Sequence, residues 1–362
     1  MPAFLYEQWD EELLARLRSH RDLLQLFQEL LLRANGDVER ALRYMEQLRR
    51  SGRLGDADIE AFQRALREKG VIDDAKGFLT LTGKGERMLR QEALSRVFSD
   101  LKRGPGGEHR TSRSGDGGER LPETRPWRFG EDVGALDVPV TLRNALVRTG
   151  TELRIGEADL EVSETEHHAI CATVLLLDVS HSMILYGEDR ITPAKRVALA
   201  MAEMIRTRYP KDSLQVCLFG DAAEEVPVER LPYVGAGPYH TNTAAALRLA
   251  QRLLLKKKHP NRRIFMVTDG KPSAIFENGK LYKNPFALDP KITAKTLEEA
   301  ASCRRNRIPI TTFMLTQDPT LVDFVDTLTR VNRGKAYYAS PDDLGNSVFV
   351  DYLRNRKRRL GN

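Results

Sequence analysis

Two aspartates in this sequence each follow an apolar run and each precede small or turn-forming residues. Asp178 comes after Leu175-Leu176-Leu177 and opens Asp178-Val179-Ser180-His181-Ser182, while Asp269 comes after Met266-Val267-Thr268 and precedes Gly270. In an extended turn alternate side chains point the same way, so Asp178, Ser180 and Ser182 can converge. If the two apolar runs are neighbouring strands of a parallel sheet, both carboxylates meet in one crevice at the carboxyl ends of the strands.

A third segment, His240-Thr241-Asn242-Thr243, precedes a helical pattern and offers the hydroxyl of Thr241. Two carboxylates and three hydroxyls are all hard oxygen donors, and they suit Mg²⁺, or Mn²⁺, in octahedral geometry with waters completing the shell. Ca²⁺ usually takes more oxygens and more carboxylate charge, and Zn²⁺ prefers His or Cys. We therefore predict a site for Mg²⁺, with Mn²⁺ possible, formed by Asp178, Ser180, Ser182, Thr241 and Asp269.

These residues resemble the metal-ion-dependent adhesion site of the von Willebrand factor A (VWA) family, whose pattern is DxSxS, then a Thr, then an Asp on a later strand. Residues 178–182 match the first element, Thr241 the second and Asp269 the third. The resemblance implies direct coordination by the two serines and the threonine, with the aspartates binding directly or through water. It also implies one remaining coordination position that accepts a Glu or Asp carboxylate from a partner protein.

A simpler interpretation of the DxSxS segment is a turn or helix-capping cluster, because Asp and Ser are common in such places. The Thr and Asp elements, present in the right order on suitable strand ends, favour the metal site instead. Around the five residues, Thr243 is expected to act as a helix cap or as a hydroxyl behind the ligands. Gly270 is expected to lie directly beside them.

The elements that would position this site alternate between strand and helix patterns. Ile170–Leu177 is a continuous apolar run, which is expected for a strand in a sheet covered on both faces. Repeated strand–helix units predict a doubly wound, mostly parallel α/β sheet, Rossmann-like in its layers. Further strands are expected at 214–219, 225–231, 263–267, 310–315 and 336–338, and helices at 193–208, 243–255, 292–302, 321–328 and 344–359.

Residues 1–103 are predicted to form a small helical domain. Apolar residues recur at helical spacing from Leu13 to Leu31, and Asn35-Gly36 is a helix-stop signal. Further helices are expected after Asp37 and Asp56, then a short strand at Phe78–Leu81 and a helix that Thr82 can cap. The pattern faintly suggests a winged-helix-like module, although many small domains combine such elements.

The composition changes abruptly after this domain. Residues 104–126 are rich in glycine and charge and can bury almost nothing, so they are predicted to be a flexible linker. Residues 127–168 are expected to form a lead-in segment that packs on the main domain, with a helix at 140–147 and strands at 153–155 and 160–162. The VWA domain is then expected to cover residues 169–362.

Length and composition limit the classes of function. Of 362 residues, 41% are hydrophobic, which suffices for a sizeable core, and the net charge of +6 falls well short of a nucleic-acid signature. The amino terminus lacks the basic region and the apolar region of a secretory signal peptide, and no apolar run is long enough to span a bilayer. A cytoplasmic protein without membrane contact is therefore predicted. Cys171, Cys217 and Cys303 form no CxxC pair and are predicted to be buried, reduced thiols.

A wider resemblance covers most of the chain from Phe78 onward. It is carried by residues 78–85, 136–145, 311–315, 332–334 and 350–352. These segments look like those of bacterial VWA proteins that resemble the chelatase VWA subunit and accompany MoxR-type or magnesium-chelatase-like AAA+ ATPases. The resemblance implies a non-enzymatic partner of such an ATPase, which would capture an acidic side chain on the metal. The pair would remodel or mature a client, or help to insert a metal.

Two other functions compete with this one. A strand-end aspartate with Mg²⁺ also occurs in metal-dependent phosphohydrolases, but the DxD pattern of the haloacid-dehalogenase type has Ser180 in its second acidic position here. The sequence has no GxxxxGK[ST] loop either, so the chain is not expected to hydrolyse ATP. A nucleic-acid-binding regulator acting through the N-terminal helices is the other alternative, and the acidic residues of those helices argue against it.

Overall fold

The computed structural model describes residues 23–55, 57–75, 77–103, 119–127, 136–150, 154–166, 170–184, 189–286, 288–316 and 318–356. The chain divides into two compact units. The first combines the described residues up to 103 with the described residues of 171–351, and the second contains those between 119 and 170 together with 352–356. Among the described residues, no helix has both the length and the apolar character needed to cross a membrane.

A six-stranded sheet forms the centre of the first unit, in the order β12-β11-β8-β5-β6-β7. All neighbours in it are parallel except β6 and β7. This arrangement confirms the predicted doubly wound, mostly parallel α/β sheet. The strands are β5 (Cys171–Asp178), β6 (Ser213–Phe219), β7 (Ala223–Val226), β8 (Asn261–Thr268), β11 (Ile310–Met314) and β12 (Lys335–Tyr338).

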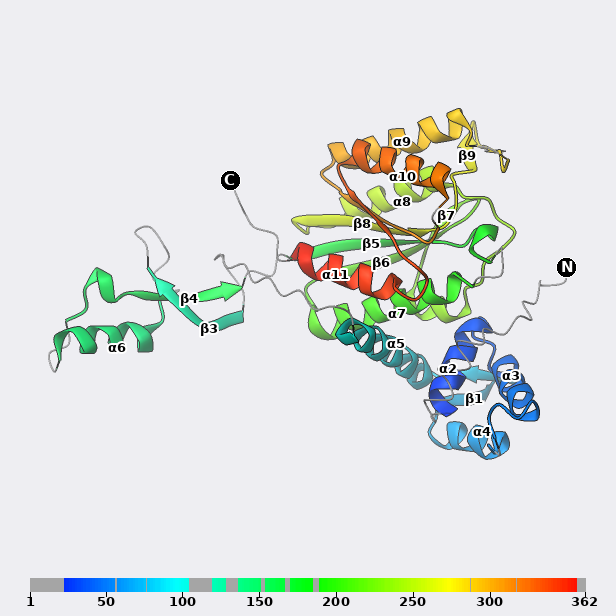
Figure 1. The fold of residues 1–362 in the computed structure, drawn as a ribbon, viewed down its shortest axis with the longest axis horizontal. Coiled ribbons are helices and arrows are strands. Elements are labelled where there is room, and N and C mark those ends of the chain that lie inside the picture. Colours follow the sequence, from blue (N-terminus) through cyan, green and yellow to red (C-terminus); the bar gives the residue numbers. More distant parts are fainter. Residues whose placement is uncertain are drawn as a thin grey trace. The chain divides into compact units, whose positions relative to one another are not determined.

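Helices cover both faces of the sheet, as the apolar strands require. Every residue of β5 is buried, because this central strand has neighbours on both edges and helices on both faces. Figure 1 shows α8, α9 and α10 on one face and α7 and α11 on the other. These helices are α7 (Ile191–Arg208), α8 (Thr243–Leu255), α9 (Pro290–Arg305), α10 (Pro319–Asn332) and α11 (Leu344–Arg356).

Two short elements near the sheet edge depart from the sequence-based expectation. The predicted strand 225–231 ends early, because β7 stops at Val226 and a 3-10 helix, η4 (Val228–Tyr233), follows. Pro227 lies between them and Pro232 lies within η4; neither has the N–H group that a continuing strand would donate. An antiparallel hairpin of β9 (Ala274–Glu277) and β10 (Lys280–Lys283), which was not predicted, follows β8.

The N-terminal helical domain is built from α2 (Leu23–Arg33), α3 (Val38–Arg50), α4 (Ile59–Glu68) and α5 (Gly83–Arg103), with a hairpin of β1 (Ile72–Ala75) and β2 (Phe78–Leu81). The predicted Phe78–Leu81 strand is confirmed. Thr82 caps α5 as predicted, because its hydroxyl accepts a hydrogen bond from the Gly85 backbone N–H at 3.1 Å. The expected helical pattern from Leu13 to Asp22 lies outside the described residues.

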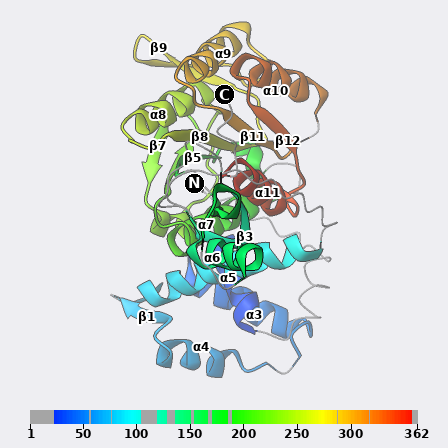
Figure 2. The same cartoon turned by 90° about the vertical axis from the view of Figure 1, so that its left-hand side faces the viewer.

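This helical domain packs directly on α7, and α5 lies along that helix (Figures 1 and 2). Buried Glu29 of α2 joins the two parts: it pairs with Arg196 of α7 and, at 2.7 Å, with Arg96 of α5. Burial raises the pKa of Glu29, but the charges of Arg196, Arg96 and Arg33 lower it by more, so that the pKa falls to about 2. The carboxylate therefore stays ionised and holds three helices together.

Lys195 of α7 is the second polar anchor between the two parts. Its ammonium group is fully buried and donates to Leu32 O at 2.6 Å, Asn35 Oδ1 at 2.9 Å and Val234 O at 2.9 Å. Three donors thus meet three acceptors, which is the condition under which a buried lysine is tolerated. The helical domain is consequently fixed to the sheet domain in this structure by specific contacts.

The second unit is small. β3 (Glu119–Pro126) pairs antiparallel with β4 (Glu161–Glu166), and α6 (Val138–Thr149) is tied to the 3-10 helix η2 (Glu157–Asp159) by two hydrogen bonds from Arg148 to Asp159, at 2.8 and 2.6 Å. All of β3 lies within residues 104–126, the predicted flexible linker: residues 119–126 form a strand instead, because their backbone pairs with β4. Residues 104–118 lie outside the described residues. No strand forms at 154–155, within the predicted strand 153–155. The expected packing of residues 127–168 on the main domain stays a prediction.

Candidate metal centre

Both predicted carboxylates lie at the same edge of the sheet. Asp178 is the last residue of β5, and Asp269 directly follows β8, which is the parallel neighbour of β5. Pairing of Leu177 with Val267 places Thr268 beside Asp178, and the Thr268 hydroxyl donates to Asp178 Oδ2 at 2.5 Å. The strand register therefore delivers both aspartates to one place, as the sequence pattern predicted.

The serines of the DxSxS segment connect the two aspartates. The Ser180 backbone N–H donates to Asp178 Oδ1 at 2.9 Å, which turns the chain back over the strand end. The hydroxyls of Ser180 and Ser182 are 3.0 Å apart, and the Ser182 hydroxyl donates to Asp269 Oδ1 at 2.7 Å. Alternate residues of the loop thus point to one side, and a row of oxygens runs from one carboxylate to the other.

Thr241 completes the group from a third loop. A Cβ atom placed on Gly270 would lie 2.8 Å from Thr241 Oγ1, 3.0 Å from Ser182 Oγ and 3.5 Å from Asp178 Oδ2. Oxygens from the β5 loop, the loop before α8 and the β8 loop therefore surround one small space that only a glycine leaves open. The structure brings all five predicted residues together, and their binding of a metal stays a prediction. We call the five residues the candidate metal site.

Of the two residues predicted to support the site, Gly270 lies where it was expected and Thr243 does not act as the helix cap. Gly270 lies directly against the site oxygens, as expected. The helix cap of α8 is Asn242 rather than Thr243, because the Asn242 side chain accepts from the Ala245 backbone N–H at 3.0 Å. Thr243 is the first residue of α8 and is buried. An amide side chain is as good a cap as a hydroxyl, which is why the sequence did not separate the two.

Sequence reasoning missed two side chains that contact the site. Thr268 could have been found, since it occupies the strand position before Asp269 and so pairs beside Asp178. Arg190 is the second: its Nη1 donates to Asp269 Oδ2 at 2.6 Å, and its side chain is 12% exposed. Nothing in the sequence distinguishes Arg190 from a solvated arginine before a helix. Its role depends on the path of a loop whose residues 185–188 lie outside the described residues.

The electrostatics of the site favour a bound cation. Burial and the neighbouring charge of Asp269 raise the pKa of Asp178 to about 7. Burial also raises the pKa of Asp269, although hydrogen bonds from Ser182 and Arg190 act in the opposite direction. Two buried carboxylates faced by one guanidinium leave an excess of negative charge, which a divalent cation would neutralise.

The donor chemistry fits a hard divalent ion. Within the described ranges, no three His, Cys, Asp or Glu side chains lie close enough together to hold a metal, so a zinc-type set is absent there. The candidate metal site instead combines two carboxylates with three hydroxyls. Asp178, Ser180, Ser182, Thr241 and Asp269 would hold Mg²⁺ or Mn²⁺, and such an ion would supply an electrophilic position for an incoming carboxylate.

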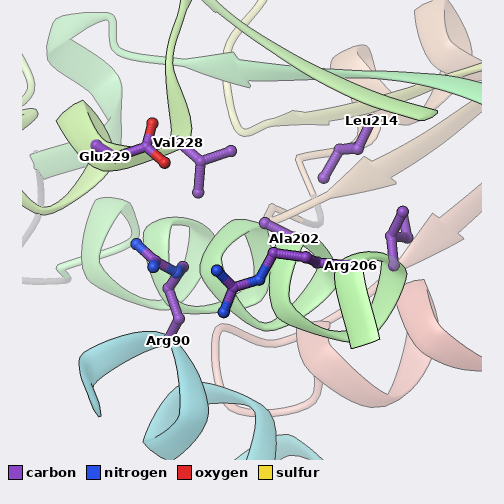
Figure 3. Close-up of a pocket in the computed structure, with 7 residues that line it drawn as sticks. Arg90, Ala202, Arg206, Leu214, Val228 and Glu229 are labelled. Carbon is purple, nitrogen blue, oxygen red and sulfur yellow. The ribbon is translucent and has the colours of Figure 1, made fainter. Parts of the chain in front are cut away.

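A cavity elsewhere in the same unit is separate from these residues. It has a volume of about 220 Å³ and is lined by Arg90, Ala202, Ile205, Arg206, Leu214, Val228 and Glu229 (Figure 3). Buried Glu203 pairs with both of its arginines, with Arg206 at 2.7 Å and with Arg90 at 3.5 Å. None of the residues of the candidate metal site lines this cavity, so it carries no part of the predicted chemistry.

The relatives of this chain include mycobacterial proteins. The uncharacterized protein Rv0959 of Mycobacterium tuberculosis is 33% identical over 357 residues, which cover 90% of this chain and 52% of that protein. A Mycobacterium bovis protein, Mb0984, matches with the same values. The chain thus spans about half the length of the curated relatives it matches.

Solved structures with a similar fold include proteins of bacterial pili. The PilB minor pilin from Streptococcus sanguinis is 14% identical, with a TM-score of 0.41, and the match covers 57% of this chain and 67% of that one. The vWF domain of the type V pili tip protein Mfa5 from Porphyromonas gingivalis is 12% identical, with a TM-score of 0.39, covering 54% and 99%. At these values the two structures say nothing about what this chain binds.

Two family models match the sequence directly. The vWA domain of the Rv0959-like proteins matches residues 171–353, which contain the six-stranded sheet and every residue of the candidate metal site. The third domain of the same proteins matches residues 119–165, which contain the β3–β4 pair and α6. This chain therefore belongs to the Rv0959-like family of VWA-domain proteins.

Proposed function

We propose that this chain is a divalent-metal-dependent protein-binding module. The VWA domain is a general protein-interaction fold, and the candidate metal site would hold Mg²⁺ and offer it to an acidic side chain of the partner. The observation that carries the proposal is the convergence of oxygens from three loops around Gly270. A cation held by few protein charges stays electrophilic toward an incoming carboxylate, so the ion would bind a partner rather than perform chemistry.

Removal of the two serine hydroxyls tests this proposal. The double variant Ser180→Ala, Ser182→Ala is expected to lose Mg²⁺ and Mn²⁺ affinity by more than about 100-fold. Mutation of a residue that only supports a metal ligand already lowers metal affinity about 10–100-fold, and this variant removes two ligands. Each lost hydrogen bond costs about 1 kcal/mol, so the fold should persist. Isothermal titration calorimetry measures the affinity, and circular dichroism verifies folding.

A matched control removes two serine hydroxyls that lie away from the site. Ser95→Ala, Ser99→Ala removes two exposed hydroxyls of α5 and should leave cation binding unchanged. Equal Mg²⁺ affinity in the wild type and the Ser180, Ser182 variant would contradict the proposal. So would hydrolysis of p-nitrophenyl phosphate that requires Mg²⁺ and is abolished by Asp178→Ala, because the chain would then be an enzyme.

Substitution of Arg190 tests the site in the opposite direction, because it is expected to strengthen Mg²⁺ binding. Its guanidinium group holds Asp269 Oδ2, so a cation at the site would lie close to a fixed positive charge that repels it. Arg190→Gln keeps a hydrogen-bond donor and removes the charge, and we expect it to tighten Mg²⁺ binding about tenfold. Calorimetry at low ionic strength measures this change, and exposed Arg230→Gln is the control. Unchanged or weaker binding in the Arg190 variant would place the cation elsewhere.

The partner that we propose is an AAA+ ATPase of the MoxR or magnesium-chelatase-like type. The support is the sequence resemblance of residues 78–85, 136–145 and 311–315 to VWA proteins that accompany such ATPases. The two proteins together would remodel or mature a client, or help to insert a metal. Binding of the purified chain to an ATPase of this type encoded in the same genome should require Mg²⁺ and fail in EDTA or with the Ser180, Ser182 variant. Binding that persists in EDTA and with the Ser180, Ser182 variant would show that contact with the ATPase does not depend on the metal site.

A further inference from the structure

The β9–β10 hairpin rises directly from the candidate metal site. The Ser273 and Ala274 backbone N–H groups donate to Thr241 O, at 2.9 and 3.3 Å, and the Thr241 N–H donates to Ser273 Oγ at 2.9 Å. The hairpin therefore begins beside Thr241, which supplies one of the three hydroxyls of the site. The hairpin pairs only within itself and is separate from the six-stranded sheet (Figure 1).

One face of the hairpin is fixed to the helices beside it. Ile275 packs with Ala244 of α8 and Ile292 of α9 in a small core. The Tyr282 hydroxyl donates to Asp289 Oδ2 at 2.9 Å, and Lys291 pairs with Glu277 at 2.6 Å. Asn278 and Gly279 form its turn with φ of 49° and 77°, the left-handed conformation that tight hairpins require. These contacts make the hairpin a rigid projection.

The other face is partly open to solvent: Phe276 and Lys283 are exposed, Leu281 is half-buried, and Ala274 at the base is buried. Phe276 alternates with buried Ile275 and is 44% exposed, and it pairs across the hairpin with Leu281. Lys283 is two residues from Leu281 on the same face and is exposed. We call Phe276, Leu281 and Lys283 the hairpin face. Phe286, just beyond β10, is 92% exposed.

The charge of this projection is positive. Residues 270–286 contain three lysines and one acidic residue, Glu277, which Lys291 already neutralises. A rigid exposed aromatic side chain is typical of the centre of a protein interface, and lysines are typical of the polar rim around it. An exposed phenylalanine alone would be unremarkable, but this one stands on a fixed hairpin that starts at a metal-site loop.

We infer that the hairpin face selects the partner of the candidate metal site. This inference rests on the proposed function. The occupant is a segment of another protein in which an Asp or Glu reaches the cation. An apolar side chain near that acid packs on Phe276 and Leu281, and further acidic residues meet the lysines. The cation supplies a carboxylate site that many proteins could use, and the hairpin face restricts it to acidic segments with a neighbouring apolar residue.

A displayed peptide library tests the inference on the full chain. Random twelve-residue peptides with one fixed central Asp are selected on the wild type in Mg²⁺ and eluted with EDTA. We expect enrichment of Leu, Ile or Phe within a few positions of the Asp, together with extra acidic residues. Phe276→Ser combined with Leu281→Ser should weaken the selected peptides at least tenfold, with unchanged Mg²⁺ affinity by calorimetry.

The control is Phe78→Ser, which removes another exposed phenylalanine, 67% exposed and located in the N-terminal hairpin, and should change neither measurement. Peptides without an apolar preference, equal binding by the hairpin variant, or no Mg²⁺-dependent peptide at all would overturn the inference. So would a Mg²⁺-dependent dimer in sedimentation that the hairpin variant cannot form, because the occupant would then be a second copy. If the wild type binds no Mg²⁺ in calorimetry, the proposed function itself fails, and the inference falls with it.

Discussion

Replacing Lys195 with methionine is expected to lower the free energy of unfolding by about 3 kcal/mol. The methionine fills the volume of the lysine stem, but it leaves Leu32 O, Asn35 Oδ1 and Val234 O without the three donated hydrogen bonds. Relief of the buried charge offsets part of this loss, since burial already lowers the pKa of Lys195 to about 8. Urea unfolding at pH 7, where the ammonium group is protonated, measures the effect.

The loss of stability in the Lys195 variant should be greatest where the helical domain meets α7. Hydrogen exchange of α2 should therefore accelerate in the Lys195 variant more than exchange of the central strand β5, because Leu32 and Asn35 belong to the helical domain. Lys256→Met, at an exposed position after α8, is the control, and its effect should stay within about 0.5 kcal/mol. A Lys195 variant as stable as the control would mean that the hydrogen bonds of Lys195 do not hold the two parts together.

Much of the sheet domain could be predicted because its residues obey simple local rules. The unbroken apolar run before Asp178 required a strand buried on both faces, and β5 is such a strand. Two aspartates at the ends of such runs had to meet once β5 and β8 paired in parallel. The predicted burial of all three cysteines is confirmed, and Cys217 and Cys303 lie in the apolar core between the sheet and its helices.

Long-range polar contacts could not be predicted, because their partners are far apart in the chain. Lys195 and Asn35 are 160 residues apart, and each alone reads as an ordinary polar residue. Arg190 is similar: only the fold places it on Asp269. The β9–β10 hairpin was missed for a different reason. Its strands are only four residues long, and their outer face carries Phe276 where an exposed strand usually carries a polar residue.

A single added methyl group is also expected to have a large effect on the candidate metal site. Gly270→Ala would place its Cβ 2.8 Å from Thr241 Oγ1 and 3.0 Å from Ser182 Oγ, within the space that the site oxygens share. The hydroxyls would have to move apart, and a cation needs them at fixed distances. We expect Mg²⁺ affinity to fall by about 100-fold, at the upper end of losses caused by residues that support metal ligands.

The fold should tolerate this change, because the glycine does not need a left-handed backbone and the strain of one added methyl group is about 1–3 kcal/mol. Calorimetry with Mg²⁺ and thermal unfolding without it separate the two effects. Gly83→Ala is the matched control: it lies at the start of α5 with nothing within 4 Å of its added methyl group, so it should leave Mg²⁺ affinity unchanged and raise stability by no more than about 1 kcal/mol. A Gly270 variant that binds Mg²⁺ like the wild type would show that the cation, if bound, does not occupy the space between Thr241 and Ser182. The convergence of three loops on Gly270 would then be a matter of packing, and the metal-dependent capture of a partner would lose its structural basis.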